Sequence, residues 1–265
     1  MKRSKPRRHG LVARAREEMI ILAIATAFLT RLPMPRRGWT LRRMAATPRW
    51  YPGVGLIVGV LVALFYWVAT ALYPPVLAAL ISTAAGLLIT GCFHEDGFAD
   101  ACDGLGGGSS RGESLEIMRD SRLGTFGVAG LFLVLGAKVL ALGALPPHAV
   151  PLILIAGHAA SRASAVVVIA TSRYIRFEGA GRPIAQGLGR RGLGLALLVA
   201  ALALLAVLCV APILALLGGI VGLFFGHALM RLVFERRLRG YTGDCLGAVQ
   251  QTSEIGFYLG LLACL

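Results

Sequence analysis

Long apolar stretches dominate this sequence and decide what it can fold into. A helix that crosses about 30 Å of hydrocarbon needs about 20 mostly apolar residues. Only 15% of the 265 residues are charged, too few to cover a surface that faces water. The sequence therefore predicts an all-α polytopic membrane helix bundle, with residues 1–265 as a single integral membrane domain. About seven stretches qualify as transmembrane helices: 53–72, 75–92, 127–145, 149–171, 192–210, 212–233 and 244–265.

The charged residues fall on one side of the predicted bundle. Three connections between the stretches are short and contain proline, whereas 93–126, 172–191 and 234–243 are longer and charged. Threading the chain through seven spans puts these three on the same side as residues 1–49, which hold 13 of the 27 Lys and Arg residues. The positive-inside rule places that side in the cytoplasm. We therefore expect an integral protein of the cytoplasmic (inner) membrane, with a cytoplasmic N-terminus and a lipid bilayer, not nucleic acid, as the partner of its net charge of +14.

The N-terminal arm divides into a basic part and a short apolar part. Residues 1–16 are interpreted as a solvated basic tail that anionic lipid attracts. Residues 19–30 are apolar, but about 12 helical residues span only about 18 Å, too short to cross the bilayer. We expect a short interfacial or re-entrant helix here. A secretory signal sequence is the alternative, and the basic character of the chain down to Arg49 argues against it.

An acidic cluster follows directly on the second apolar stretch. In helical geometry Asp96, Asp100 and Asp103 stand at i, i+4 and i+7, so three carboxylates share one face. Carboxylates at this spacing repel one another, and a hard divalent cation such as Mg²⁺, with phosphate and water as further ligands, would stabilise them. A solvated acidic loop is the alternative. We predict a cytoplasmic acidic motif loop over 93–126.

Arginines and a further acid follow the cluster. Arg119, Asp120 and Arg122 lie close together, and their side chains could pair with one another or clamp a phosphate. His94 or Asp120 is a candidate catalytic base that takes a proton from an attacking hydroxyl, and the sequence does not choose between them.

Polar side chains inside apolar stretches are costly and indicate partners or function. His158 and Arg162 are i, i+4 neighbours in the fourth stretch, either an internal hydrogen-bonded pair or an arginine that meets a substrate phosphate. Glu254 lies well inside the last stretch, which begins at Asp244, and its carboxylate needs a partner. Lys138 is interpreted as a packing or interface residue.

Several motifs, in a fixed order, resemble those of one known family. The resemblance is to cobalamin synthase, the membrane-bound adenosylcobinamide-GDP ribazoletransferase family, and it covers nearly the whole chain. The motifs are Phe28-Leu29-Thr30-Arg31-Leu32-Pro33, Tyr51-Pro52-Gly53-Val54-Gly55, His94-x-Asp96-Gly97-x-Ala99-Asp100-x-x-Asp103-Gly104, Ile117-Met118-Arg119-Asp120-Ser121-Arg122-Leu123-Gly124-Thr125-Phe126-Gly127, Ser161-Arg162 and Gly243-Asp244-x-x-Gly247-Ala248.

The resemblance implies an enzyme that joins adenosylcobinamide-GDP to α-ribazole, or to α-ribazole 5′-phosphate, with release of GMP and a requirement for Mg²⁺. We expect Asp96, Asp100 and Asp103 to hold the metal. One position departs from the family's pattern, because Glu95 stands where an apolar residue is expected. Glu95 is then either a further metal ligand or a side chain that faces water.

The same interpretation assigns residues to the substrate. Phosphate oxygens suit guanidinium groups, which bind them in a bidentate manner. A possible homo-oligomer is compatible with the sequence, which does not fix the number of copies. The expected substrate-binding residues are Arg119, Arg122, Arg162 and Asp244.

Two other classes of membrane protein are weighed against this interpretation. A CDP-alcohol phosphatidyltransferase would carry an Asp-x-x-Asp-Gly-x-x-Ala-Arg pattern followed by paired aspartates, which this chain lacks. A transporter could line its pathway with Arg162 and Glu254. No internal two-fold repeat is evident, and the acids gather outside the predicted bundle, so both observations oppose transport.

Overall fold

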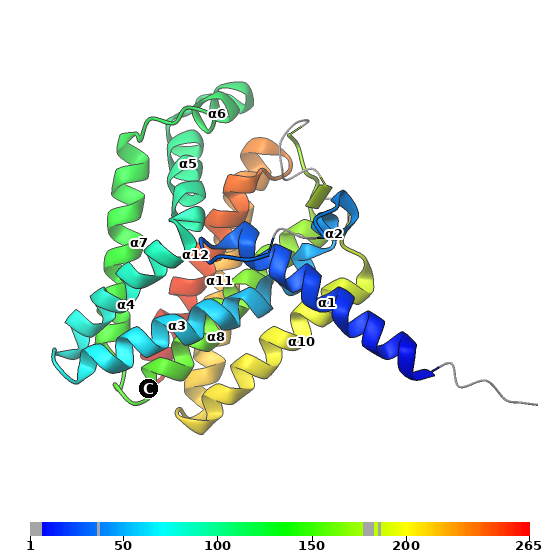
Figure 1. Ribbon diagram of the computed structural model, residues 1–265. Helices are drawn as coiled ribbons and strands as arrows, with labels where there is room; N and C mark the ends of the chain where they lie inside the picture. The colour runs from blue at the N-terminus through cyan, green and yellow to red at the C-terminus, as the bar shows by residue number, and fades with distance from the viewer. Residues whose placement is uncertain (1–6, 36–37, 177–182, 185–186) are drawn as a thin grey trace, which may run out of the picture.

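The protein is built from helices, as the computed structural model shows for residues 7–35, 38–176, 183–184 and 187–265 (Figure 1). Across these ranges the β-structure is a single isolated bridge, so the predicted all-α class is confirmed. Two helices are short, α2 (Leu41–Ala45) and α6 (Arg111–Ile117), and Thr47–Trp50 and Val207–Cys209 form 3₁₀ turns. The long helices are α1 (Arg7–Leu29), α3 (Tyr51–Thr70), α4 (Pro75–Thr90), α5 (Phe93–Gly107), α7 (Thr125–Ala144), α8 (Val150–Thr171), α10 (Arg190–Ala206), α11 (Ile213–Leu238) and α12 (Gly243–Ala263).

Membrane-spanning character is clearest in five segments of the described chain. They are long and apolar enough to cross a bilayer, and each contains one of α3, α7, α8, α10 and α11. A sixth span is present if α4 and α5 count as one helix bent by 91°. Helix α12 occupies the seventh predicted stretch, but it carries Gln250, Gln251 and Glu254 and is not in this set. The polytopic bundle is confirmed, while the count of seven stays a prediction.

Two expectations, one about the acidic connection and one about the N-terminal arm, are corrected. The predicted loop over 93–126 is mostly helical, since α5 and α6 lie within it. Glu95 and Asp96 lie in the first turn of α5, where their acidic side chains interact favourably with the positive end of the helix dipole. The helix also packs against α12 and α7. The N-terminal helix is also longer than expected. Helix α1 begins at Arg7 and includes the described part of the predicted basic tail; residues 1–6 lie outside the described ranges.

A sharp bend separates α4 from α5 and sets the direction of the acidic helix. Gly91 and Cys92 both have left-handed backbones, with φ of 66° and 59°. A side chain at Gly91 would also collide with Arg31, whose backbone N–H donates to the carbonyl of Ile89 at 2.8 Å. Only glycine adopts this conformation without strain in such a crowded place. The bend lets α5 leave the axis of α4 and run beside α7 (Figure 1).

Helix packing is closest where small residues line the interface. In α11 and α12, Gly218 and Gly222 face Gly260 and Gly256, and an added Cβ on any of the four would collide with the backbone of the other helix. Membrane helices associate closely through such stripes of small residues. Helix α8 is the most enclosed candidate span, with 83% of its apolar window buried against 22–50% for the other four. The bundle is therefore built around α8, and the other spans present apolar faces outward.

The charged connections lie at the same end of the bundle, as predicted. Backbone hydrogen bonds link Tyr241 to Arg173 and Ile175, which joins the connection after α8 to the one after α11. The Arg111 guanidinium donates to the carbonyl of Leu238 at 2.8 Å, which joins the acidic connection to the end of α11. The same end therefore gathers basic residues from all three charged connections.

Candidate functional site

Helix α5 meets the beginning of α12 through glycines. A Cβ at Gly97 would lie 3.0 Å from Cα of Asp244, and a Cβ at Gly247 would lie 2.7 Å from the carbonyl oxygen of His94. The two backbones approach this closely only because neither glycine has a side chain. The approach brings Asp244 to the acidic helix, so residues about 150 positions apart in the sequence form one site.

Four aspartates and one arginine share this site. The three predicted carboxylates stand on one face of α5, and the charges that act on Asp100 come from Asp244, Asp96, Arg176 and Asp103. Asp96 is exposed and Asp100 is half-buried. Among the described residues, neither of these two side chains accepts a hydrogen bond or forms an ion pair, so their oxygens remain available to a ligand.

Asp103 has a structural task in addition to its place on the acidic face. Its two carboxylate oxygens accept hydrogen bonds from the backbone N–H groups of Gly124 and Gly127, each at 2.8 Å. These N–H groups lie at the start of α7, where they have no partner within the helix and where the helix dipole favours a negative charge. Asp103 therefore fixes α7 against α5.

Arg176 was not predicted as a site residue, and it closes the site on the side of Asp244. Its guanidinium donates to the carboxylate of Asp244 at 2.8 Å and to the carbonyl of Met118 at 3.3 Å. Its Nε is buried with no hydrogen-bond partner among the described residues. From the sequence, Arg176 is only one of the charged residues in the 172–191 connection. No helical spacing or motif relates it to Asp244.

The arginine segment before α7 lies at the surface. Arg119 and Arg122 are exposed, and Arg122 pairs with Asp120 at 2.5 Å. Hydrogen bonding to Arg122 lowers the pKa of Asp120 to about 2, so this carboxylate is ionised at neutral pH and is a weak proton acceptor. The predicted ion pair is thus present, and it occupies Arg122, one of the three arginines expected to meet phosphate.

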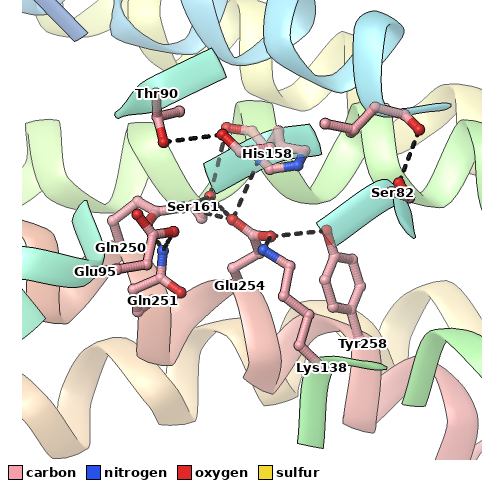
Figure 2. Close-up of polar contacts among 12 residues, drawn as sticks. Ser82, Thr90, Glu95, Lys138, His158, Ser161, Gln250, Gln251, Glu254 and Tyr258 are labelled. Carbon is pink, nitrogen blue, oxygen red and sulfur yellow. Dashed lines mark hydrogen bonds and ion pairs between the residues drawn. The ribbon is translucent and has the colours of Figure 1, made fainter. Parts of the chain in front are cut away.

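A second polar cluster lies inside the bundle and centres on Glu254, which is 1% exposed (Figure 2). Its carboxylate pairs with Lys138 and lies 3.4 Å from Nδ1 of His158. Gln250 and Tyr258 donate to it at 2.5 and 3.1 Å. The expectation that Glu254 needs a partner is confirmed, and the interpretation of Lys138 as a mere packing or interface residue is wrong, because Lys138 is that partner.

Glu95 belongs to this interior cluster and not to the acidic face. Gln251 donates to one of its carboxylate oxygens at 2.8 Å, and the other oxygen is buried with no hydrogen-bond partner among the described residues. Successive helical residues are about 100° apart, so Glu95 points away from the face that carries Asp96 and Asp100. The structure therefore places Glu95 neither in water nor beside the three expected metal ligands.

Arg162 lies between the interior cluster and a larger pocket. It is 2% exposed, and its guanidinium contacts Nδ1 and the backbone oxygen of His158 at 3.1 and 3.0 Å, so the predicted pair within α8 is confirmed. The small cavity beside Glu254 measures about 10 Å³, room for one water at most. The larger pocket measures about 280 Å³, and its lining includes Arg162, His94 and Arg176.

The donor chemistry of the acidic site suits magnesium, but the protein alone does not form a complete cage. Within the described ranges no three His, Cys, Asp or Glu side chains stand close enough together to hold a metal ion. Mg²⁺ is commonly bound by one or two carboxylates plus substrate phosphates and water. The free oxygens of Asp96 and Asp100 fit that kind of site.

Fold and site together define a polytopic all-α membrane protein with an acidic site at the end where its charged connections meet. The chain belongs to the cobalamin-5-phosphate synthase family, whose sequence model matches residues 21–262. The family suggested by the motifs is therefore confirmed.

Several curated relatives carry the name adenosylcobinamide-GDP ribazoletransferase. The protein of Ralstonia nicotianae is 42% identical over 260 residues, covering 96% of this chain and 98% of its own. The proteins of Leptothrix cholodnii and Shewanella frigidimarina are 43% and 36% identical, each covering 93% of this chain and 96% and 95% of their own. No solved structure is similar enough to match.

Proposed function

We propose that this protein joins adenosylcobinamide-GDP to α-ribazole, or to α-ribazole 5′-phosphate, and releases GMP. The observation that carries the proposal is the acidic face of α5, where Asp96 and Asp100 keep free carboxylate oxygens beside Asp244 and Arg176. The names of the relatives supply the substrates, since the chain is similar to them over nearly its whole length. The hydroxyl oxygen of the ribazole forms a bond to the phosphorus that bears the corrinoid, the bond from that phosphorus to the GMP oxygen breaks, and the hydroxyl proton leaves to a base.

Asp96 and Asp100 would hold Mg²⁺ in this proposal. Bound there, the ion would neutralise the negative charge of the diphosphate and of the departing phosphate. Asp103 contributes its negative charge to the same face while it holds α7 in place. The carboxylate of Asp244 keeps Arg176 extended toward the site.

The basic groups around the acidic face bind and orient the substrates. Arg176, which pairs with Asp244 at the acidic site, and the exposed Arg119 would meet phosphate oxygens. His94 lines the pocket that Arg176 also lines, whereas Asp120 is held by Arg122. We therefore propose His94 as the proton acceptor, acting from the pocket side of α5 and not from the face that carries Asp96.

The charged end of the bundle would face the cytoplasm in the inner membrane. That end gathers the basic residues of the connections, which the positive-inside rule places in the cytoplasm. A nucleotide-activated substrate made in the cytoplasm would then reach the acidic site directly. The cavity beside Glu254, at about 10 Å³, leaves no space for a transported solute, and this argues against the transporter alternative.

The test is an assay of the purified protein in lipid nanodiscs. Adenosylcobinamide-GDP and α-ribazole are supplied with Mg²⁺, and GMP and the joined product are quantified. The proposal expects equal amounts of the two products, and no turnover after the metal is removed with EDTA until Mg²⁺ is restored. Turnover that is unaffected by EDTA would contradict the role of the metal, and release of GMP without a joined product would contradict the transfer.

A further inference from the structure

One pocket at the acidic site has a lining that differs from the site itself. We call it the aromatic pocket. It measures about 280 Å³ and lies where α1, α5, α8 and α12 meet the segment around Tyr174 and Tyr241. Most of its surface is apolar, and the rings of Tyr174 and Tyr241 pack edge to face at 5.4 Å. The aromatic residues in its lining are Phe28, Tyr51, Phe93, Tyr174 and Tyr241.

The size of the aromatic pocket excludes most of the corrinoid substrate. Pockets for drug-sized ligands range over about 300–1,000 Å³, so a cavity of about 280 Å³ accepts a bicyclic ring and a sugar but not a corrin macrocycle. The two remaining candidates are the guanosine of the activated substrate and the base of the acceptor nucleoside.

The hydrogen-bonding groups of the pocket distinguish these two candidates. Guanine presents both acceptors, which arginine can read, and N–H donors on its pairing edge, which need acceptors such as carboxylates and amide oxygens. Among the described residues, no Asp, Glu, Asn or Gln side chain lines the pocket, whereas Arg162 and Arg176 do. A benzimidazole-type base has no N–H donor when joined to ribose and offers one ring nitrogen as acceptor. The lining fits the second kind of base.

Arg162 provides the donor that such a base requires. Its side chain is 2% exposed and lines the pocket, and among the described residues only one of its guanidinium nitrogens, Nη1, has hydrogen-bond partners, both on His158. A buried donor without a partner is costly, so a ligand that accepts a hydrogen bond from it gains affinity. At another part of the lining Arg176 extends toward Asp244 and the acidic face.

We propose that the aromatic pocket binds the uncharged bicyclic base of the acceptor nucleoside, with Arg162 donating to its ring nitrogen and the ribose directed past Arg176 toward the aspartates. This inference rests on the proposed function, since it names the place of one of the two substrates. It accounts for an arginine buried within α8 and for the run of aromatic residues beside an acidic site.

Filling the pocket from two helices tests the proposal. Ala165→Leu on α8 and Leu246→Phe on α12 both add volume at lining positions. Ala170→Leu is the matched control, because Ala170 lies on α8 but is exposed and outside the lining. Equilibrium dialysis with α-ribazole measures binding in nanodiscs, and steady-state assays measure KM for α-ribazole and for adenosylcobinamide-GDP.

We expect the dissociation constant and KM for α-ribazole to rise at least about 10-fold in both filled variants, while their KM for adenosylcobinamide-GDP stays unchanged. In the control Ala170→Leu all three constants should stay at their native values. Guanosine should not displace α-ribazole. Unchanged α-ribazole binding in both filled variants, or a rise in KM for adenosylcobinamide-GDP alone, would overturn the assignment. Dialysis separates this inference from the proposed function, because binding that Ala165→Leu abolishes supports the pocket even in a protein that releases no GMP.

Discussion

The interior cluster around Glu254 and the acidic face of α5 are two neighbouring groups of charged side chains. They differ in how their charges are compensated. Glu254 is buried and surrounded by partners, chiefly Lys138, Gln250 and Tyr258. Asp96 and Asp100 lie at an open face with free oxygens beside further carboxylates. Burying a charge without a partner is costly, and the charge of Glu254 is compensated within the protein. The charges of the open face have no such partners among the described residues, and it is there that the proposed function places a cation and a phosphate.

The largest effect is expected from breaking the interior cluster. Lys138→Met leaves the carboxylate of Glu254 without its cation, and loss of one partner from a buried pair costs about 3–5 kcal/mol. The midpoint of denaturant unfolding in detergent should fall accordingly. Lys138→Met combined with Glu254→Met should recover most of the lost stability, and a single variant as stable as the native chain would contradict the structural role of the pair.

The opposite behaviour is expected at the open face. Asp100→Asn removes a charge that no described residue pairs, so stability should not fall, while turnover should drop by about 10²–10³, as for loss of one electrostatic group in a catalytic site. GMP release and thermal unfolding are measured on the same preparation. Glu116→Gln, an exposed acid in the same connection, is the control and should retain activity. Retained turnover in Asp100→Asn would refute the catalytic assignment.

Asp103 should behave as an intermediate between the two clusters. Asp103→Asn weakens the acceptors for the N–H groups of Gly124 and Gly127, and loss of such a helix-terminal interaction costs about 0.5–2 kcal/mol. Unfolding measurements should show that loss, and hydrogen exchange should rise at the start of α7. Exchange that stays at the native rate would mean that Asp103 does not hold α7.

The smallest effect is expected from Asp120→Asn. The pKa of Asp120 is lowered to about 2 by Arg122, so the ion pair contributes fully above the ordinary pKa of aspartate and is lost only as the pH falls through about 2. Because an exposed pair contributes little even where it is fully formed, the variant should lie close to the native chain in stability between pH 5 and 8, and its turnover should stay within about two-fold. A large loss of turnover would return the role of proton acceptor to Asp120.

Regular features of the fold were predictable because local patterns determine them. Apolar length predicted the helices, and helical spacing put Asp96, Asp100 and Asp103 on one face. The same spacing paired His158 with Arg162, as the structure confirms. Because a carboxylate buried in an apolar helix is costly, the sequence predicted that Glu254 has a partner, but it did not identify the partner.

Long-range features were not predictable from these patterns. Lys138 was assigned to packing because a lysine in an apolar helix can face either lipid or the interior, and only the packing of α7 against α12 decides this. Arg176 reaches Asp244 across 68 positions of sequence, through a connection without periodicity. The predicted loop became helix α5 because its glycines permit close packing on α12, which no single-segment pattern reveals.

Binding of Mg²⁺ tests most directly whether the open aspartates form the working site. Isothermal titration in nanodiscs would compare the native chain, the double variant Asp96→Asn/Asp100→Asn and Glu116→Gln, each saturated with adenosylcobinamide-GDP. Stoichiometric binding in the native chain and Glu116→Gln, with at least about 10-fold weaker binding in the double variant, is the expected result. Equal affinity in all three proteins would contradict the assignment of the metal to this face.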